Sequence, residues 1–85
     1  HVATLESGPG DLALAVLTTE PGLQLYDAPT LDIPVPGIGG RGYGPRAGLA
    51  IEPQRFPDAP NHAHFPSVIL RPGEISRQES AFVFT

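Results

Sequence analysis

The sequence predicts an all-β protein of short antiparallel strands, and three observations lead to this prediction. Runs of apolar residues, such as LALAVL at 12–17 and AFVF at 81–84, are typical of packed strands. The 10 glycines and 11 prolines among the 85 residues separate these runs with turns and rigid loops. No segment shows a sustained apolar period of 3.6 residues, so no amphipathic helix is expected.

The N-terminal part is predicted to form a hairpin. Residues 4–7 lead into a turn at 8–11, and residues 12–19 then return as the second strand. A second turn follows at 20–22 (EPG), where proline presets one central residue and Gly22 can take a positive φ.

Residues 22–26 are predicted to be extended. Because side chains alternate along a strand, Leu23 and Leu25 would lie on one face and Gln24 and Tyr26 on the other. Residues 27–46 follow as a long excursion without regular structure, and long loops inside compact proteins are often functional or disordered.

The next strand, residues 49–54, carries the most informative carboxylate of the chain. Leu49 and Ile51 alternate with Glu52 and Gln54, so one face of the strand presents a carboxylate and an amide together. Proline is tolerated in sheets at edges, ends and bulges, so Pro53 predicts that Glu52 stands where the strand stops, at the edge of a cleft. A proline-rich loop at 55–66, an apolar run at 67–70, a turn at 71–74 and a closing strand at 75–84 complete the chain.

Two side chains are candidates for binding or catalysis. Glu52 could act as a general base, since a carboxylate held in a partly dry cleft can have its pKa raised toward the working pH. Gln24 could bond a polar ligand. The alternative for both is an ordinary solvated side chain on a half-exposed strand.

The loop after the Glu52 strand contains the sequence PDAPNHAH. His62 and His64 would share a face if extended and could bind a metal, but no third ligand has recognisable spacing, so we expect no metal site. The alternative is a stiff loop in which Asp58 and Asn61 bond nearby backbone groups.

Composition narrows the possible partners. The net charge is −4 and the five basic residues are scattered arginines, so nucleic acid is not expected as a partner. No apolar run reaches the roughly 20 residues of a membrane span, and no targeting signal is visible, so we expect no membrane partner and a cytoplasmic location. The absence of cysteine excludes disulfides and thiolate metal sites.

Three motifs carry a family resemblance: TTEPGLQLY at 18–26, GLAIEPQRFPDAPNHAHFPS at 48–67 and LRPGE at 70–74. In this order they resemble the C-terminal part of the aldose 1-epimerase, or galactose mutarotase, family. The resemblance implies a large antiparallel β-sandwich, with residues 1–85 as the C-terminal part of a single domain. It also implies a small-molecule sugar substrate, no metal or organic cofactor, and a need for the N-terminal part of the same protein.

The resemblance also implies roles for both candidates. In the family a glutamate removes the proton of the sugar's C1 hydroxyl while a histidine protonates the ring oxygen, and the ring opens and recloses to the other anomer. Glu52 matches that glutamate, and Gln24 matches a sugar-contacting glutamine. The acid histidine belongs to a part of the family that precedes this segment. The chain departs from the family pattern at Pro53 (threonine), His62 (glutamine) and residues 26–29 (YTGN).

Two other functions remain open from the sequence. One is a non-catalytic carbohydrate-binding or structural sandwich domain, because related sandwich domains bind sugar without converting it. The other is a small free-standing β domain, which would unfold cooperatively in isolation.

Overall fold

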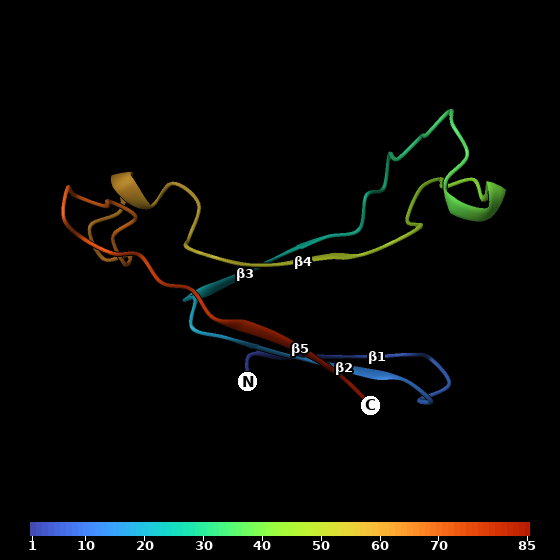
Figure 1. Cartoon of the computed structure of the whole chain (residues 1–85), viewed down its shortest axis with the longest axis horizontal. Coiled ribbons are helices and arrows are strands. Elements are labelled where there is room, and N and C mark those ends of the chain that lie inside the picture. Colours follow the sequence, from blue (N-terminus) through green and yellow to red (C-terminus); the bar gives the residue numbers. More distant parts are fainter.

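The computed structural model describes all residues, 1–85, and contains two antiparallel sheets and no α-helix (Figure 1). The first sheet has three strands in the order β1-β2-β5, and the second pairs β3 with β4. The elements are β1 (Ala3–Glu6), β2 (Ala13–Thr18), β3 (Gly22–Tyr26), the 3₁₀ turn η1 (Ile38–Gly40), β4 (Ala50–Gln54), the 3₁₀ turn η2 (Ala59–Asn61) and β5 (Ser80–Phe84). The prediction of an all-β antiparallel protein is confirmed.

The predicted N-terminal hairpin is present as β1 and β2. Leu5 lies opposite Leu14, and the intervening turn contains Gly10 in the left-handed region at φ 74°. β5 pairs with the other edge of β2, where Leu14 lies opposite Phe84. Val16 in the central strand is fully buried between these neighbours.

The closing strand is shorter than predicted, because it begins at Ser80 and not near residue 75. β2 ends at Thr18, which lies opposite Ser80, so the regular pairing of the two strands begins there. The residue before Ser80 makes one further contact with this strand, because the Glu79 carbonyl accepts a hydrogen bond from the Thr19 amide at 3.0 Å. Ile75 has no such partner and is 94% exposed.

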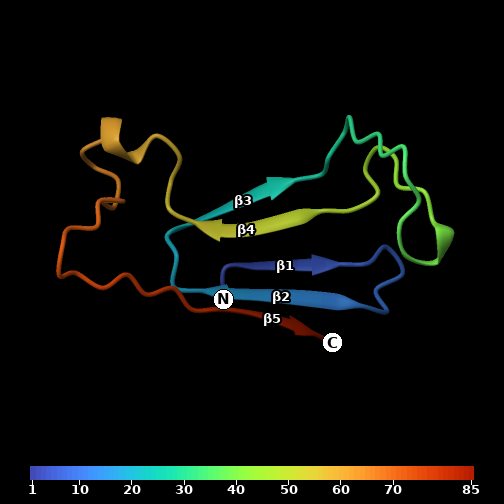
Figure 2. The same cartoon turned by 45° about the horizontal axis from the view of Figure 1, so that its top comes forward.

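The excursion at 27–46 is irregular apart from η1, as predicted, but its two ends are joined. Arg46 Nε contacts Asp27 Oδ2 at 3.0 Å, and the Arg46 amide donates to the Ala28 carbonyl at 3.1 Å. The loop therefore leaves β3 and re-enters β4 at one end of that strand pair (Figure 2).

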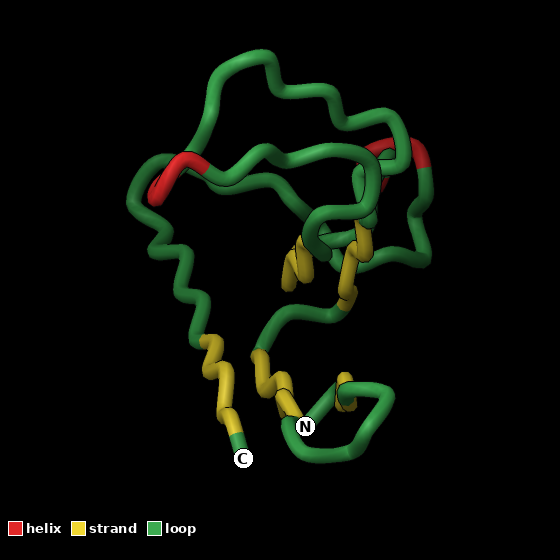
Figure 3. Tube along the Cα trace, turned by 90° about the vertical axis from the view of Figure 1, so that its right-hand side faces the viewer, coloured by secondary structure: helices red, strands yellow, loops and turns green.

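The chain buries almost none of its own apolar surface. Only Val16 and Ala59 are buried, while Phe82 and Phe84 of the three-stranded sheet are 46% and 65% exposed. The radius of gyration is 16.9 Å, against about 12 Å for a compact domain of this length. Seen end-on, the long loops lie on one side of the strands and both termini lie on the other (Figure 3). The two sheets therefore lack a common core within these residues.

This open arrangement predicts how residues 1–85 behave in isolation. With two buried residues, hydrophobic burial cannot offset the entropy of ordering the chain, so we expect a molten or aggregating species. Far-UV and near-UV circular dichroism should show no shared cooperative unfolding transition, and ANS fluorescence should increase on binding. A single transition with one midpoint for both signals would instead indicate a free-standing domain.

Candidate active site

The pairing of β3 with β4 places Gln24 directly opposite Glu52. Directly opposite side chains of an antiparallel pair share one face of the sheet, with Cβ atoms about 4.5–5.5 Å apart. The two candidates that the sequence placed on separate strands are therefore neighbours. A carboxylate and an amide at this spacing can contact the same small polar ligand.

The same register makes one face of the strand pair polar and the other apolar. Gly22 lies opposite Gln54 and Tyr26 opposite Ala50, so the Gln54 and Tyr26 side chains flank the Gln24 and Glu52 pair. The reverse face carries Leu23, Leu25, Ile51 and Pro53. The alternation in the sequence already indicated both faces, although Gln54 and Tyr26 were not singled out as site residues.

The position of Glu52 within its strand differs from the prediction. Glu52 is the third of the five residues of β4, and the strand continues through Pro53 to Gln54. The Pro53 carbonyl accepts a hydrogen bond from Gln78 Nε2 at 3.2 Å, on the edge of β4 that no strand covers. The nitrogen and carbonyl of a residue face the same side of an antiparallel strand, so the Pro53 nitrogen also faces this open edge. Its missing N–H therefore removes no hydrogen bond from the ladder between β3 and β4.

Both candidate side chains are exposed to solvent. Gln24 Nε2 donates to the Leu25 carbonyl at 3.0 Å, and the Glu52 carboxylate makes no hydrogen bond or ion pair. A small cavity of about 70 Å³ borders Gln24 but not Glu52. The partly dry cleft predicted around Glu52 is therefore not formed by these 85 residues.

Gly22 has a different role from the one predicted for it. The φ angle of Gly22 is not positive. Glycine is required here because there is no room for a side chain. A Cβ there would lie 3.0 Å from two ring carbons of Phe56 and 3.1 Å from the Gln54 carbonyl oxygen. The start of β3 and the chain leaving β4 therefore pack closely, on the same two strands that carry the candidate residues.

The loop after β4 contains several local hydrogen bonds, although they differ from those predicted. The backbone amides of Asn61 and His62 are satisfied by the carbonyls of Asp58 and Ala59 within η2. The Asp58 carboxylate is therefore free to bond the side chains of Asn61 and His62, the latter at 3.0 Å, and does not bond backbone groups.

The two histidines are held within that loop. The ring of Phe65 lies 4.8 Å from that of His62, 4.5 Å from that of His64 and 4.9 Å from that of Phe56, measured between ring centres. No group of three or more histidine, aspartate or glutamate side chains is placed so that it could hold a metal ion. These histidines therefore act in the packing of the loop.

Fold and site together define an antiparallel β protein that presents a carboxylate and an amide side by side on an open polar face. The sequence model of the aldose 1-epimerase family matches residues 1–82, so the chain belongs to the aldose 1-epimerase family.

No helix in the structure has the length and apolar character needed to cross a membrane.

Individual relatives agree with this assignment. The chain is 43% identical over 72 residues to a galactose mutarotase of Bos taurus and 42% identical over 72 residues to one of Homo sapiens; each match covers 85% of this chain and 21% of the relative. It is also 43% identical over 65 residues to an aldose 1-epimerase of Escherichia coli, covering 74% of this chain and 18% of the relative. The chain thus spans about a fifth of the length of the relatives it matches.

The contact between Gly22 and Phe56 yields a prediction for stability. Gly22→Ala in the full protein should lower the free energy of unfolding by about 1–3 kcal/mol, the usual range for forcing extra atoms into a packed site. Urea unfolding would measure this, with Gly8→Ala as the matched control, because a Cβ at Gly8 meets nothing within 4 Å. Equal free energies for the two variants would show that the close approach has no energetic consequence.

Proposed function

We propose that the chain is the C-terminal part of an enzyme that interconverts the α and β anomers of a free aldohexose such as galactose or glucose. Membership of the aldose 1-epimerase family supports sugar anomer chemistry in general. The single observation that carries the finer proposal is the register that sets Gln24 opposite Glu52 on the polar face of β3 and β4. Those are the two positions at which the family resemblance implies a base and a sugar contact.

Glu52 serves as the general base in this proposal. Its carboxylate removes the proton of the C1 hydroxyl as the bond between C1 and the ring oxygen breaks, and C1 becomes a carbonyl carbon. The ring oxygen takes up a proton from an acid. After rotation about the C1–C2 bond the steps run in reverse, the ring oxygen attacks the other face of C1, and Glu52 returns its proton. An exposed carboxylate without an internal partner is free for this exchange.

Gln24 orients the sugar. A side-chain amide can donate and accept at once, and a hydroxyl group offers both functions in return. Because Gln24 lies directly across from Glu52, a hydroxyl that it binds brings the neighbouring carbons of the same ring within reach of the carboxylate. The amide therefore contributes binding and orientation but no proton transfer.

The acid and the walls of the site come from the N-terminal part of the protein in this proposal. His62 and His64 are engaged with Asp58 and Phe65 in their own loop, so neither is assigned the acid role. Residues that cover the polar face would also exclude water around Glu52, which these 85 residues leave exposed.

The base assignment predicts the effect of Glu52→Gln in the full protein. Removing the base while keeping the side-chain shape should lower kcat by about 10²–10⁴-fold, the usual contribution of general acid–base catalysis. Polarimetry on freshly dissolved α-galactose and α-glucose measures the rate. Glu6→Gln is the matched control, because Glu6 is an exposed strand glutamate in β1, and it should leave the rate unchanged.

The same assay separates the enzyme from a binding domain. A protein that binds galactose in calorimetry but never accelerates the loss of optical rotation would be a non-catalytic carbohydrate-binding domain. An unchanged rate in Glu52→Gln would show that another group is the base.

Gln24→Ala should mainly weaken sugar binding. Loss of one hydrogen bond worth about 0.5–1.5 kcal/mol corresponds to a KM increase of roughly 2–13-fold, with a smaller change in kcat. The saturation curve from the same polarimetric assay gives both constants. A large fall in kcat at constant KM would instead place Gln24 in the transition-state chemistry.

A further inference from the structure

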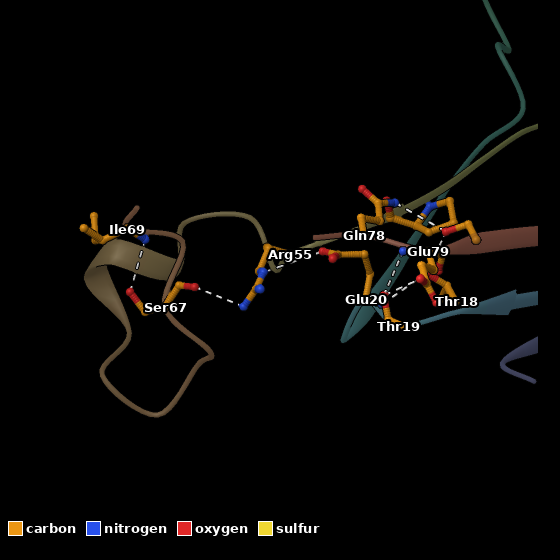
Figure 4. Close-up of polar contacts among 10 residues, drawn as sticks. Thr18, Thr19, Glu20, Arg55, Ser67, Ile69, Gln78 and Glu79 are labelled. Carbon is orange, nitrogen blue, oxygen red and sulfur yellow. Dashed lines mark hydrogen bonds and ion pairs between the residues drawn. The ribbon is translucent and has the colours of Figure 1, made fainter. Parts of the chain in front are cut away.

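One side-chain link joins the chain segments that surround the candidate site. Arg55 Nε lies 3.6 Å from Glu20 Oε2, and Arg55 Nη1 donates to the Ser67 carbonyl at 3.1 Å (Figure 4). Glu20 belongs to the turn between β2 and β3, Arg55 directly follows β4, and Ser67 follows the loop that contains η2. One guanidinium therefore holds three separate segments together.

This link is not an ordinary surface ion pair. The Glu20 side chain is only 9% exposed and the Arg55 side chain 44%, whereas both partners of the Arg46–Asp27 and Arg77–Glu79 pairs are more than half exposed. A guanidinium presents several donors in a fixed planar arrangement, so it can serve a carboxylate and a carbonyl simultaneously.

A second set of contacts holds the same end of β4 from the side of the three-stranded sheet. Gln78 Nε2 donates to the Pro53 carbonyl at 3.2 Å and lies 3.4 Å from Ser80 Oγ. The Glu79 amide donates to Thr19 Oγ1 at 3.0 Å, so the approach to β5 is tied to the end of β2. The end of β4 is thus connected to the chain that leads into β5 of the three-stranded sheet.

The link acts on the two strands that carry the candidate residues, and it does so at one end of their ladder. Glu20 precedes β3, which carries Gln24, and Arg55 follows β4, which carries Glu52. We propose that Glu20 and Arg55 are a positioning pair that fixes Glu52 and Gln24 relative to one another. The inference rests on the proposed anomer interconversion, and neither residue touches the sugar in it.

Charge-removing variants of the full protein test this inference. Arg55→Gln and Glu20→Gln should each lower kcat by about tenfold with KM changed less than about twofold, because a displacement near 1 Å can cost up to about 10²-fold in rate. Arg55→Lys, which keeps the charge but loses the planar donors, should regain part of the loss. The double variant should cost no more than either single one, because the two residues act as a unit.

The matched control is Arg41→Gln, because Arg41 makes no ion pair or side-chain hydrogen bond. Its kcat should equal that of the unchanged protein. If Arg55→Gln does not fold, the kcat of Glu20→Gln alone tests the positioning role, since this substitution preserves the shape of the side chain and one acceptor oxygen.

The outcomes separate this inference from the proposed function. Anomer interconversion with normal kcat in Arg55→Gln and Glu20→Gln, or additive losses in the double variant, overturns the positioning role and leaves the function standing. A fall in Tm without a change in kcat shows a purely structural pair and also overturns it. An unchanged protein that does not interconvert anomers overturns both.

Discussion

The register between β3 and β4 is the constraint on which the site depends. A shift of one residue along either strand would turn its side chains to the opposite face and separate Gln24 from Glu52. The ladder is held at both ends by contacts of its flanking residues. Asp27 and Arg46 pair where the long excursion leaves and returns, and Glu20 and Arg55 pair at the other end. A slip of the ladder would displace both pairs, and the Glu20–Arg55 pair is the less exposed of the two.

The three-stranded sheet serves a different purpose from the two-stranded one. Its strands carry leucine, valine and phenylalanine on a face that stays largely uncovered, so the apolar surface available for burial exceeds what these residues bury. Such faces are stable only when another layer packs against them. The chain spans about a fifth of the length of the relatives it matches.

Local patterns in the sequence were sufficient to predict where the strands lie but not which strands pair with one another. Alternation placed Gln24 and Glu52 on polar faces because side-chain direction depends only on neighbouring residues. The pairing of their strands, the closing strand's start at Ser80 and the bridge from Glu20 to Arg55 depend on contacts distant in sequence. The proline rule misplaced Glu52 at a strand end, because an open sheet edge also tolerates proline. The glycine rule allowed Gly22 a positive φ, whereas the observed reason for glycine there is the close approach of the Phe56 ring.

The departures from the family pattern fall away from the polar face. Pro53, where the family commonly has threonine, lies opposite Leu23 on the apolar face. His62, where glutamine is common, is held by Asp58 and Phe65 in the loop after β4. The replaced stretch after Tyr26 begins with Asp27, which is engaged with Arg46. Each change is therefore accommodated by packing or by a local ion pair, and none of them replaces Gln24 or Glu52 on the polar face.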